Sequence, residues 1–187
     1  MRVQRTRSSA SRHRAPLTRR SLGDQGRLFA SITVGMVLLL SVSTVGHGDD
    51  IRSASDARRA LLEGSFTIVT KTQEIPEPVL VLFASLTNTK GRVLADPGAR
   101  YQVTDVVSEP GLPWRRLVFA GNGKGIYFLN YERGGIAHSQ LVAVFEYVPG
   151  RVSLVWRAAL NRKADSLTAL RDAVRKGQYS DGSEYGF

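Results

Sequence analysis

The chain has 187 residues, of which 42% are hydrophobic, a size and composition typical of one folded domain and not of a disordered protein. It contains no cysteine, which excludes disulfides, thiol catalysis, thiolate metal sites and lipid attachment through a cysteine. The net charge of +10 is unevenly distributed along the chain. Residues 1–27 hold eight arginines and one aspartate, a charge of +7, so residues 28–187 carry only +3 and we predict no nucleic-acid partner.

The N-terminal region has the organisation of an export signal. Residues 1–27 are rich in arginine, and we predict that they are disordered. Residues 28–46 carry no charge, and the segment 28–48 ends in small residues, as the apolar and cleavage regions of a signal peptide do. Because basic residues stay on the cytoplasmic side of the inner membrane, we expect the rest of the chain to be exported, either periplasmic or secreted.

The same apolar segment supports an alternative, an uncleaved transmembrane anchor. Residues 28–46 as one helix would span about 28 Å, close to the ~30 Å hydrocarbon core. The C-terminal domain would then lie outside, tethered to the inner membrane. Residues 18–22 resemble part of a twin-arginine signal, so the route stays open between that pathway and the general secretory one.

The first elements after the leader are short. Residues 53–63 predict a helix with Ser53 as its N-terminal cap, and the alternation in 66–70 predicts a strand. Residues 77–87 are apolar with an early proline and exceed a usual strand in length, so we favour a helix over a strand. Residues 88–100 lack periodicity and predict a loop with a turn.

From residue 101 onward the pattern indicates β-structure. The segments that alternate, or that are rich in β-branched and aromatic residues, are 102–107, 115–120, 126–131, 137–147 and 152–158. Glycine-containing turns at 121–125 and 149–151 predict two hairpins. A last helix is predicted over 165–176, capped by Asp165 and ended by Gly177, and residues 179–187 are predicted to be a flexible tail.

These elements predict an exported α+β domain over residues 51–178. Its core would be an antiparallel meander sheet of five or six strands, with two or three short helices covering one face. The N-terminal apolar signal or anchor helix would precede it. Arg115 and Arg116 follow Trp114 and, as neighbours on a strand, would face opposite sides; we favour a solvated sheet edge here over a patch for an anionic partner.

A polar cluster at residues 130–139 holds the candidate site. Ligand contacts are predicted at Tyr131, Glu132, Arg133, His138 and Gln140. A catalytic role would make His138 a general base oriented by Glu132, and the alternative is a histidine hydrogen-bonded at the rim of the sheet. His138 is the only histidine within 51–178, so a multi-histidine metal site is excluded, and we predict neither a metal nor a cofactor.

No recognised catalytic motif is present. The sequence lacks a GxSxG elbow, and the glycine-rich segment 121–125 departs from a phosphate loop because glycine follows its lysine. We therefore expect a non-enzymatic module that binds a protein or a small molecule and contacts the inner membrane, at least transiently, through 28–46. Two alternatives stay open: a hydrolase that uses the 130–139 cluster, and a membrane-anchored accessory subunit of an envelope complex.

Overall fold

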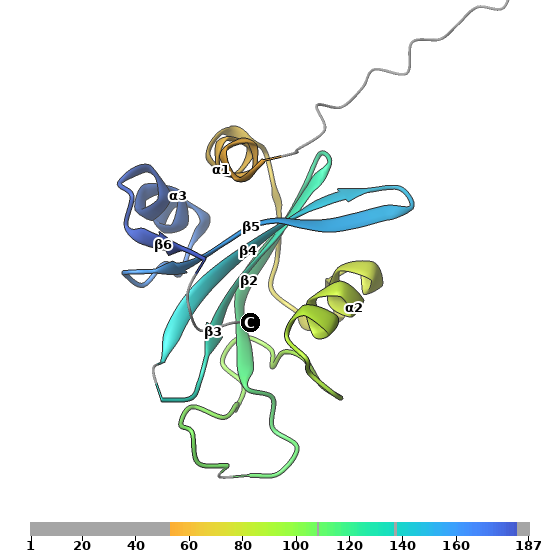
Figure 1. Cartoon of the computed structure of the whole chain (residues 1–187), viewed down its shortest axis with the longest axis vertical. Helices are drawn as coiled ribbons and strands as arrows, with labels where there is room; N and C mark the ends of the chain where they lie inside the picture. The colour runs from red at the N-terminus through yellow and green to blue at the C-terminus, as the bar shows by residue number, and fades with distance from the viewer. Residues whose placement is uncertain (1–52, 108, 137, 183–187) are drawn as a thin grey trace, which may run out of the picture. The chain divides into compact units, whose positions relative to one another are not determined.

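The computed structural model describes residues 53–107, 109–136 and 138–182 (Figure 1). The arginine-rich segment and the predicted signal or anchor helix lie outside these ranges. Within them, no helix has the length and apolar character that crossing a membrane requires.

Six strands form one antiparallel sheet, and their order in the sheet is their order in the chain. The strands are β1 (Thr67–Val69), β2 (Arg115–Gly123), β3 (Ile126–Arg133), β4 (Ser139–Val148), β5 (Arg151–Leu160) and β6 (Tyr179–Asp181). The helices are α1 (Ala54–Glu63), α2 (Glu77–Leu86) and α3 (Leu167–Arg175), with a single 3₁₀ turn, η1 (Thr72–Glu74), before α2. The prediction of an α+β domain with an antiparallel meander is therefore confirmed.

The helices cover both faces of the sheet, which corrects the expectation that they cover one. Leu61 of α1 and Leu170 of α3 join the core on one face, whereas Val79 and Phe83 of α2 join the core on the other (Figure 1). Strands β3 and β4 are buried along almost their whole length, because apolar side chains point to both sides. A sheet with two apolar faces needs a cover on each of them.

Helices α1 and α3 lie side by side although they stand at opposite ends of the described chain. Arg171 of α3 donates from Nε to the carbonyl oxygen of Leu61 at 3.0 Å, and its guanidinium also binds the carbonyl of Gly64. These are carbonyls at the C-terminal end of α1, where a cation is favourable to the helix dipole. The arginine therefore fastens the two helices to each other.

Glycines make the central hairpins. Gly125 and Gly150 turn them with φ of 72° and 77°, in the left-handed region that glycine adopts without strain. Gly121, predicted to lie in the first turn, is within β2 instead. A Cβ there would stand 2.2 Å from the ring of Phe128, so the missing side chain allows this aromatic ring to pack against the strand.

The segment 102–107, predicted to be a strand, is a loop with Val103 and Val106 exposed. The outer edge of β2 is already occupied. Strand β1 pairs with its far end, and Ala95 bridges to Arg116 near its start. The alternating segment therefore does not pair with β2 and bonds instead to residues that flank the strands, since Gln102 donates to the carbonyl of Pro113 at 2.9 Å and Gly135 to that of Val103 at 3.1 Å.

The C-terminal elements differ from the prediction at two points. The cap of α3 is Ser166 and not Asp165, since the Ser166 hydroxyl accepts a hydrogen bond from the amide of Ala169 at 3.2 Å. Residues 179–181, expected in a flexible tail, form β6 and pair with the end of β5. This added strand builds one wall of the site described next.

Candidate functional site

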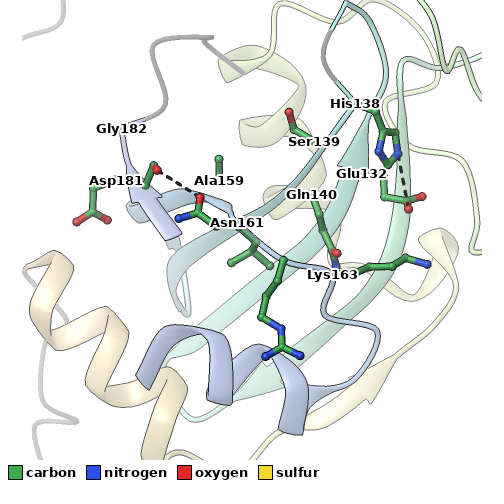
Figure 2. Close-up of a pocket in the computed structure, with 12 residues that line it drawn as sticks. Glu132, His138, Ser139, Gln140, Ala159, Asn161, Lys163, Asp181 and Gly182 are labelled. Atoms are coloured by element: carbon green, nitrogen blue, oxygen red, sulfur yellow. Dashed lines mark hydrogen bonds and ion pairs between the residues drawn. The ribbon is translucent and has the colours of Figure 1, made fainter. Parts of the chain in front are cut away.

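An open cavity of about 680 Å³, here called the His138 pocket, lies where the ends of β3, β4 and β5 meet the loop before α3 and the short β6 (Figure 2). Its lining residues are Glu132, His138, Ser139, Gln140, Ala159, Leu160, Asn161, Arg162, Lys163, Ser180, Asp181 and Gly182. Three sequence segments, 132–140, 159–163 and 180–182, therefore converge on one concave surface, and three of the predicted site residues are among them.

Glu132 and His138, the predicted catalytic pair, face each other in this pocket (Figure 2). The Nε2 atom of His138 lies 3.7 Å from Oε1 of Glu132 and 2.8 Å from the hydroxyl of Tyr101. The other carboxylate oxygen of Glu132 binds Arg116, whose Nε is 2.8 Å away. The charge of this buried carboxylate is therefore balanced by the arginine.

Tyr101 engages Nε2, one of the two ring nitrogens of His138. Burial raises the pKa of Tyr101, the charge of Glu132 raises it further, and Arg116, with its guanidinium 4.6 Å from the ring, opposes that shift. The phenol is therefore protonated at neutral pH. Its hydroxyl donates to Nε2 of His138 or accepts from it, according to the imidazole tautomer, and it also lies 3.5 Å from Oε2 of Glu132, so Nε2 is engaged within the protein.

Gln140 lines the pocket, but its polar atoms are used within the protein. Its Nε2 donates to Oδ1 of Asn130 at 2.9 Å and to the carbonyl of Ala164 at 2.8 Å, and its Oε1 accepts from the amide of Ala164 at 3.0 Å. Asn130 donates to the same carbonyl at 2.8 Å. The two amide side chains fasten the loop before α3 to the sheet, and this loop carries the polar residues 161–163.

Arg162 and Lys163 form a positive rim on that loop. Their carboxylate partners, Asp172 and Asp165, lie 3.6 Å and 3.5 Å away, and the two cationic side chains are 50% and 69% exposed. Ion pairs this exposed contribute only about 0–1 kcal/mol, so a ligand can compete for these cations. Asp181, also exposed, adds a carboxylate to the lining, and the pocket thus presents both signs of charge.

Tyr131 and Arg133, also predicted as ligand contacts, do not reach this pocket. They alternate with Glu132 along β3 and so face the opposite side of the sheet. Tyr131 is 1% exposed and meets the ring of Phe83 edge-to-face at 5.0 Å, and burial raises its pKa to about 12. Arg133 lines a different pocket. The cluster 130–139 is therefore divided between two faces.

The expectation of a solvated edge at Arg115 and Arg116 is wrong. Arg115 is only 5% exposed, and Arg116 is held by Glu132. The two side chains do face opposite sides, as the strand geometry predicted, since Arg116 binds Glu132 of the His138 pocket and Arg115 lines a second pocket. The sequence could not show that each arginine is covered by a loop.

Within the described ranges, no group of three histidine or carboxylate side chains is placed to hold a metal ion. No protein-family model, no curated protein and no solved structure matches this chain. The function therefore has to be inferred from the pocket and its side chains.

Proposed function

We propose that this protein is an exported domain that binds a small polar ligand in the His138 pocket and does not transform it. The observation that carries the proposal is the convergence of polar side chains from β3, β4, the 161–163 loop and β6 on one cavity of about 680 Å³. Cavities of this size are typical of small-molecule sites. The export part rests on the arginine-rich leader followed by an uncharged apolar segment.

The lining indicates the chemistry of the ligand. Arg162 and Lys163 suit an acidic group, while the side-chain amide of Asn161 offers a donor and an acceptor for a hydroxyl or amino group. Ala159 and Leu160 supply an apolar surface beside these polar side chains. A small molecule with an anionic group, a hydrogen-bond donor and a short apolar part fits this arrangement.

Binding is favoured over hydrolysis at this pocket. Tyr101 holds Nε2 of His138, and Arg116 neutralises the carboxylate that would orient the imidazole. Figure 2 shows the hydroxyl of Ser139 directed away from the His138 ring. Nucleophilic hydrolysis needs a base, an orienting group and a nucleophile that are aligned with one another. These side chains do not form such an arrangement.

The test is ligand binding to the full chain, purified in the form that accumulates outside the cytoplasm, with its N-terminus sequenced to see whether the leader is removed. A panel of amino acids, small carboxylates and sugar acids is screened by amide chemical-shift changes. We expect saturable shifts at residues 138–140, 159–163 and 180–182, and at least about tenfold weaker binding in Lys163→Ala.

The matched control is Lys124→Ala, which removes another exposed lysine, in the β2–β3 turn. It should bind as the unaltered chain does. Equal weakening in both variants, or shifts confined to another face of the domain, would count against the His138 pocket as the binding site. Turnover of a bound compound that His138→Ala abolishes would instead establish the hydrolase alternative.

A further inference from the structure

A second cavity, of about 500 Å³, lies on the opposite face of the sheet, beside the residues that follow α2; we call it the Arg115 pocket. Arg115, Arg133 and Lys90 all line it, and none of its lining residues is acidic. The charged residues that line this pocket are thus all positive, whereas the His138 pocket is lined by residues of both signs.

Arg115 is a buried cation that has no counter-ion within residues 53–107, 109–136 and 138–182. It is 5% exposed, and among the described residues no carboxylate pairs with it. Its Nη1 donates to the Thr89 hydroxyl at 3.0 Å, whereas its Nε has no hydrogen-bond partner. Burial lowers the pKa of Arg115, and the charge of Arg133 adds to that effect. A buried charge normally has an ionic partner, because its desolvation is otherwise uncompensated.

Arg133 increases the positive charge at this point. It is the residue directly across from Arg115 in the β2–β3 ladder, and like charges in such positions repel each other. Exposed Lys90 lies at the same cavity. An anion bound among the three side chains would relieve this repulsion.

The end of α2 does not supply the missing negative charge. The last-turn carbonyls of Phe83, Ala84 and Ser85 accept hydrogen bonds from the backbone amides of residues 87–89 at 3.0 to 3.2 Å. The hydroxyls of Thr87 and Thr89 lie 2.8 Å apart and hold each other in place beside Arg115. The chain thus caps its own helix and keeps the guanidinium oriented at the cavity.

We propose that the Arg115 pocket binds an organic anion through a phosphate or carboxylate group held by Arg115, Arg133 and Lys90. A guanidinium fork matches the oxygens of both groups. The cavity exceeds a single oxyanion in volume, and Trp114 in its lining offers an aromatic surface for the rest of the molecule. This site is separate from the His138 pocket and does not depend on the ligand proposed there.

The experiment uses the full chain with inorganic phosphate and citrate as probes, and sodium chloride at equal ionic strength as the reference. Calorimetric titration should show saturable binding of at least one probe, and the thermal unfolding midpoint should rise with its concentration. Lys90→Gln, a change at an exposed side chain, should weaken binding about tenfold and leave the far-ultraviolet circular dichroism spectrum unchanged. Arg115→Lys keeps the charge but loses the planar fork, and should weaken binding further.

Two controls separate this site from the other pocket and from general charge effects. Lys163→Ala, in the His138 pocket, and Lys124→Ala, in a distant turn, should bind both probes as the unaltered chain does. Binding that Lys163→Ala abolishes and Lys90→Gln leaves intact would overturn the proposal, as would the absence of saturable binding.

Vesicles with and without phosphatidylglycerol distinguish a lipid headgroup from a free anion. Vesicle binding that requires the anionic lipid, is weakened by Lys90→Gln and is displaced by phosphate would support the site with a lipid as its source. Phosphate or citrate binding without vesicle binding would support it with a free metabolite as the source. Vesicle binding that Lys90→Gln and phosphate both leave unchanged, with no saturable binding of either probe, would contradict it.

Discussion

Gln140 uses both ends of its side-chain amide to hold one residue, Ala164, and this makes it a positioning residue for the His138 pocket. In Gln140→Leu, the Ala164 amide loses its acceptor inside the protein, and the side-chain oxygen of Asn130 loses a donor. We expect the free energy of unfolding to fall by about 2–3 kcal/mol, because buried polar groups left without partners are costly. Urea denaturation measures this change.

Gln178→Leu is the matched control, since the Gln178 side chain accepts only an exposed hydrogen bond from Arg162 at 3.4 Å. Its effect should stay under about 1 kcal/mol, as for most surface substitutions. Equal losses in the two variants would mean that the bonds from Gln140 to the 164 backbone add no stability of their own.

Tyr131 makes stability depend on alkaline pH. Burial raises its pKa from 10.0 to about 12. Since the folded-state pKa is the higher one, the contribution of the protonated phenol is fully present below about pH 10 and is lost as the pH rises toward 12. This group alone should lower the free energy of unfolding by about 3 kcal/mol across that window.

Urea unfolding at a series of pH values above neutrality measures the effect. The variant Tyr131→Phe should lose less stability between about pH 10 and 12 than the unaltered chain does. Parallel pH profiles for the two proteins would show that Tyr131 does not titrate with a raised pKa in the folded state.

At the residue scale, the sequence predicts the pocket residues only where they lie in or beside a single polar segment. Glu132, His138 and Gln140 were singled out, because they crowd a short polar segment. Tyr101 was missed because its neighbours alternate like a strand, and only the packed fold shows that they form a loop over Arg116.

At the scale of the elements, β6 is held by side-chain contacts as well as by its pairing with β5. It has three residues, and Asp181 at its end accepts a hydrogen bond from the Trp156 indole and pairs with Arg58 at 3.3 Å. We expect Asp181→Ala to loosen β6 and to speed hydrogen exchange of its amides, while those of α2 stay unchanged.

Asp165→Ala provides the control, because Asp165 forms only an exposed pair with Lys163. Exchange of the β6 amides in that variant should match the unaltered chain. If Asp181→Ala exchanges no faster than Asp165→Ala, the strand is held by its backbone pairing to β5 alone.

Element prediction succeeded where local chemistry decides the structure. Ser53 caps α1 by accepting from the amide of Asp56 at 3.1 Å, and the Pro149–Gly150 turn closes the second hairpin, both as predicted. It failed where a strand needs a partner, as at 102–107 and at 179–181. Pairing depends on which sheet edge is still open, and a single segment carries no information on that.

At the scale of the whole molecule, β3 serves both pockets. Glu132 faces the His138 pocket, and the next residue, Arg133, faces the Arg115 pocket. The sheet itself lies between the two pockets, with α1 and α3 on one of its faces and α2 on the other (Figure 1). The two pockets therefore have no lining residue in common, and ligands bound in them would contact different side chains.

The packing of α1 against α3, held by Arg171, has a consequence for folding during synthesis. Residues 54–63 emerge early during synthesis, but the helix they pack against is formed by residues 167–175. Until those last residues are present, the face that bears Phe119 and Val142 lacks half of its cover. The core on this face is therefore completed only when residues 167–175 have been synthesised, and until then its apolar side chains stay uncovered there.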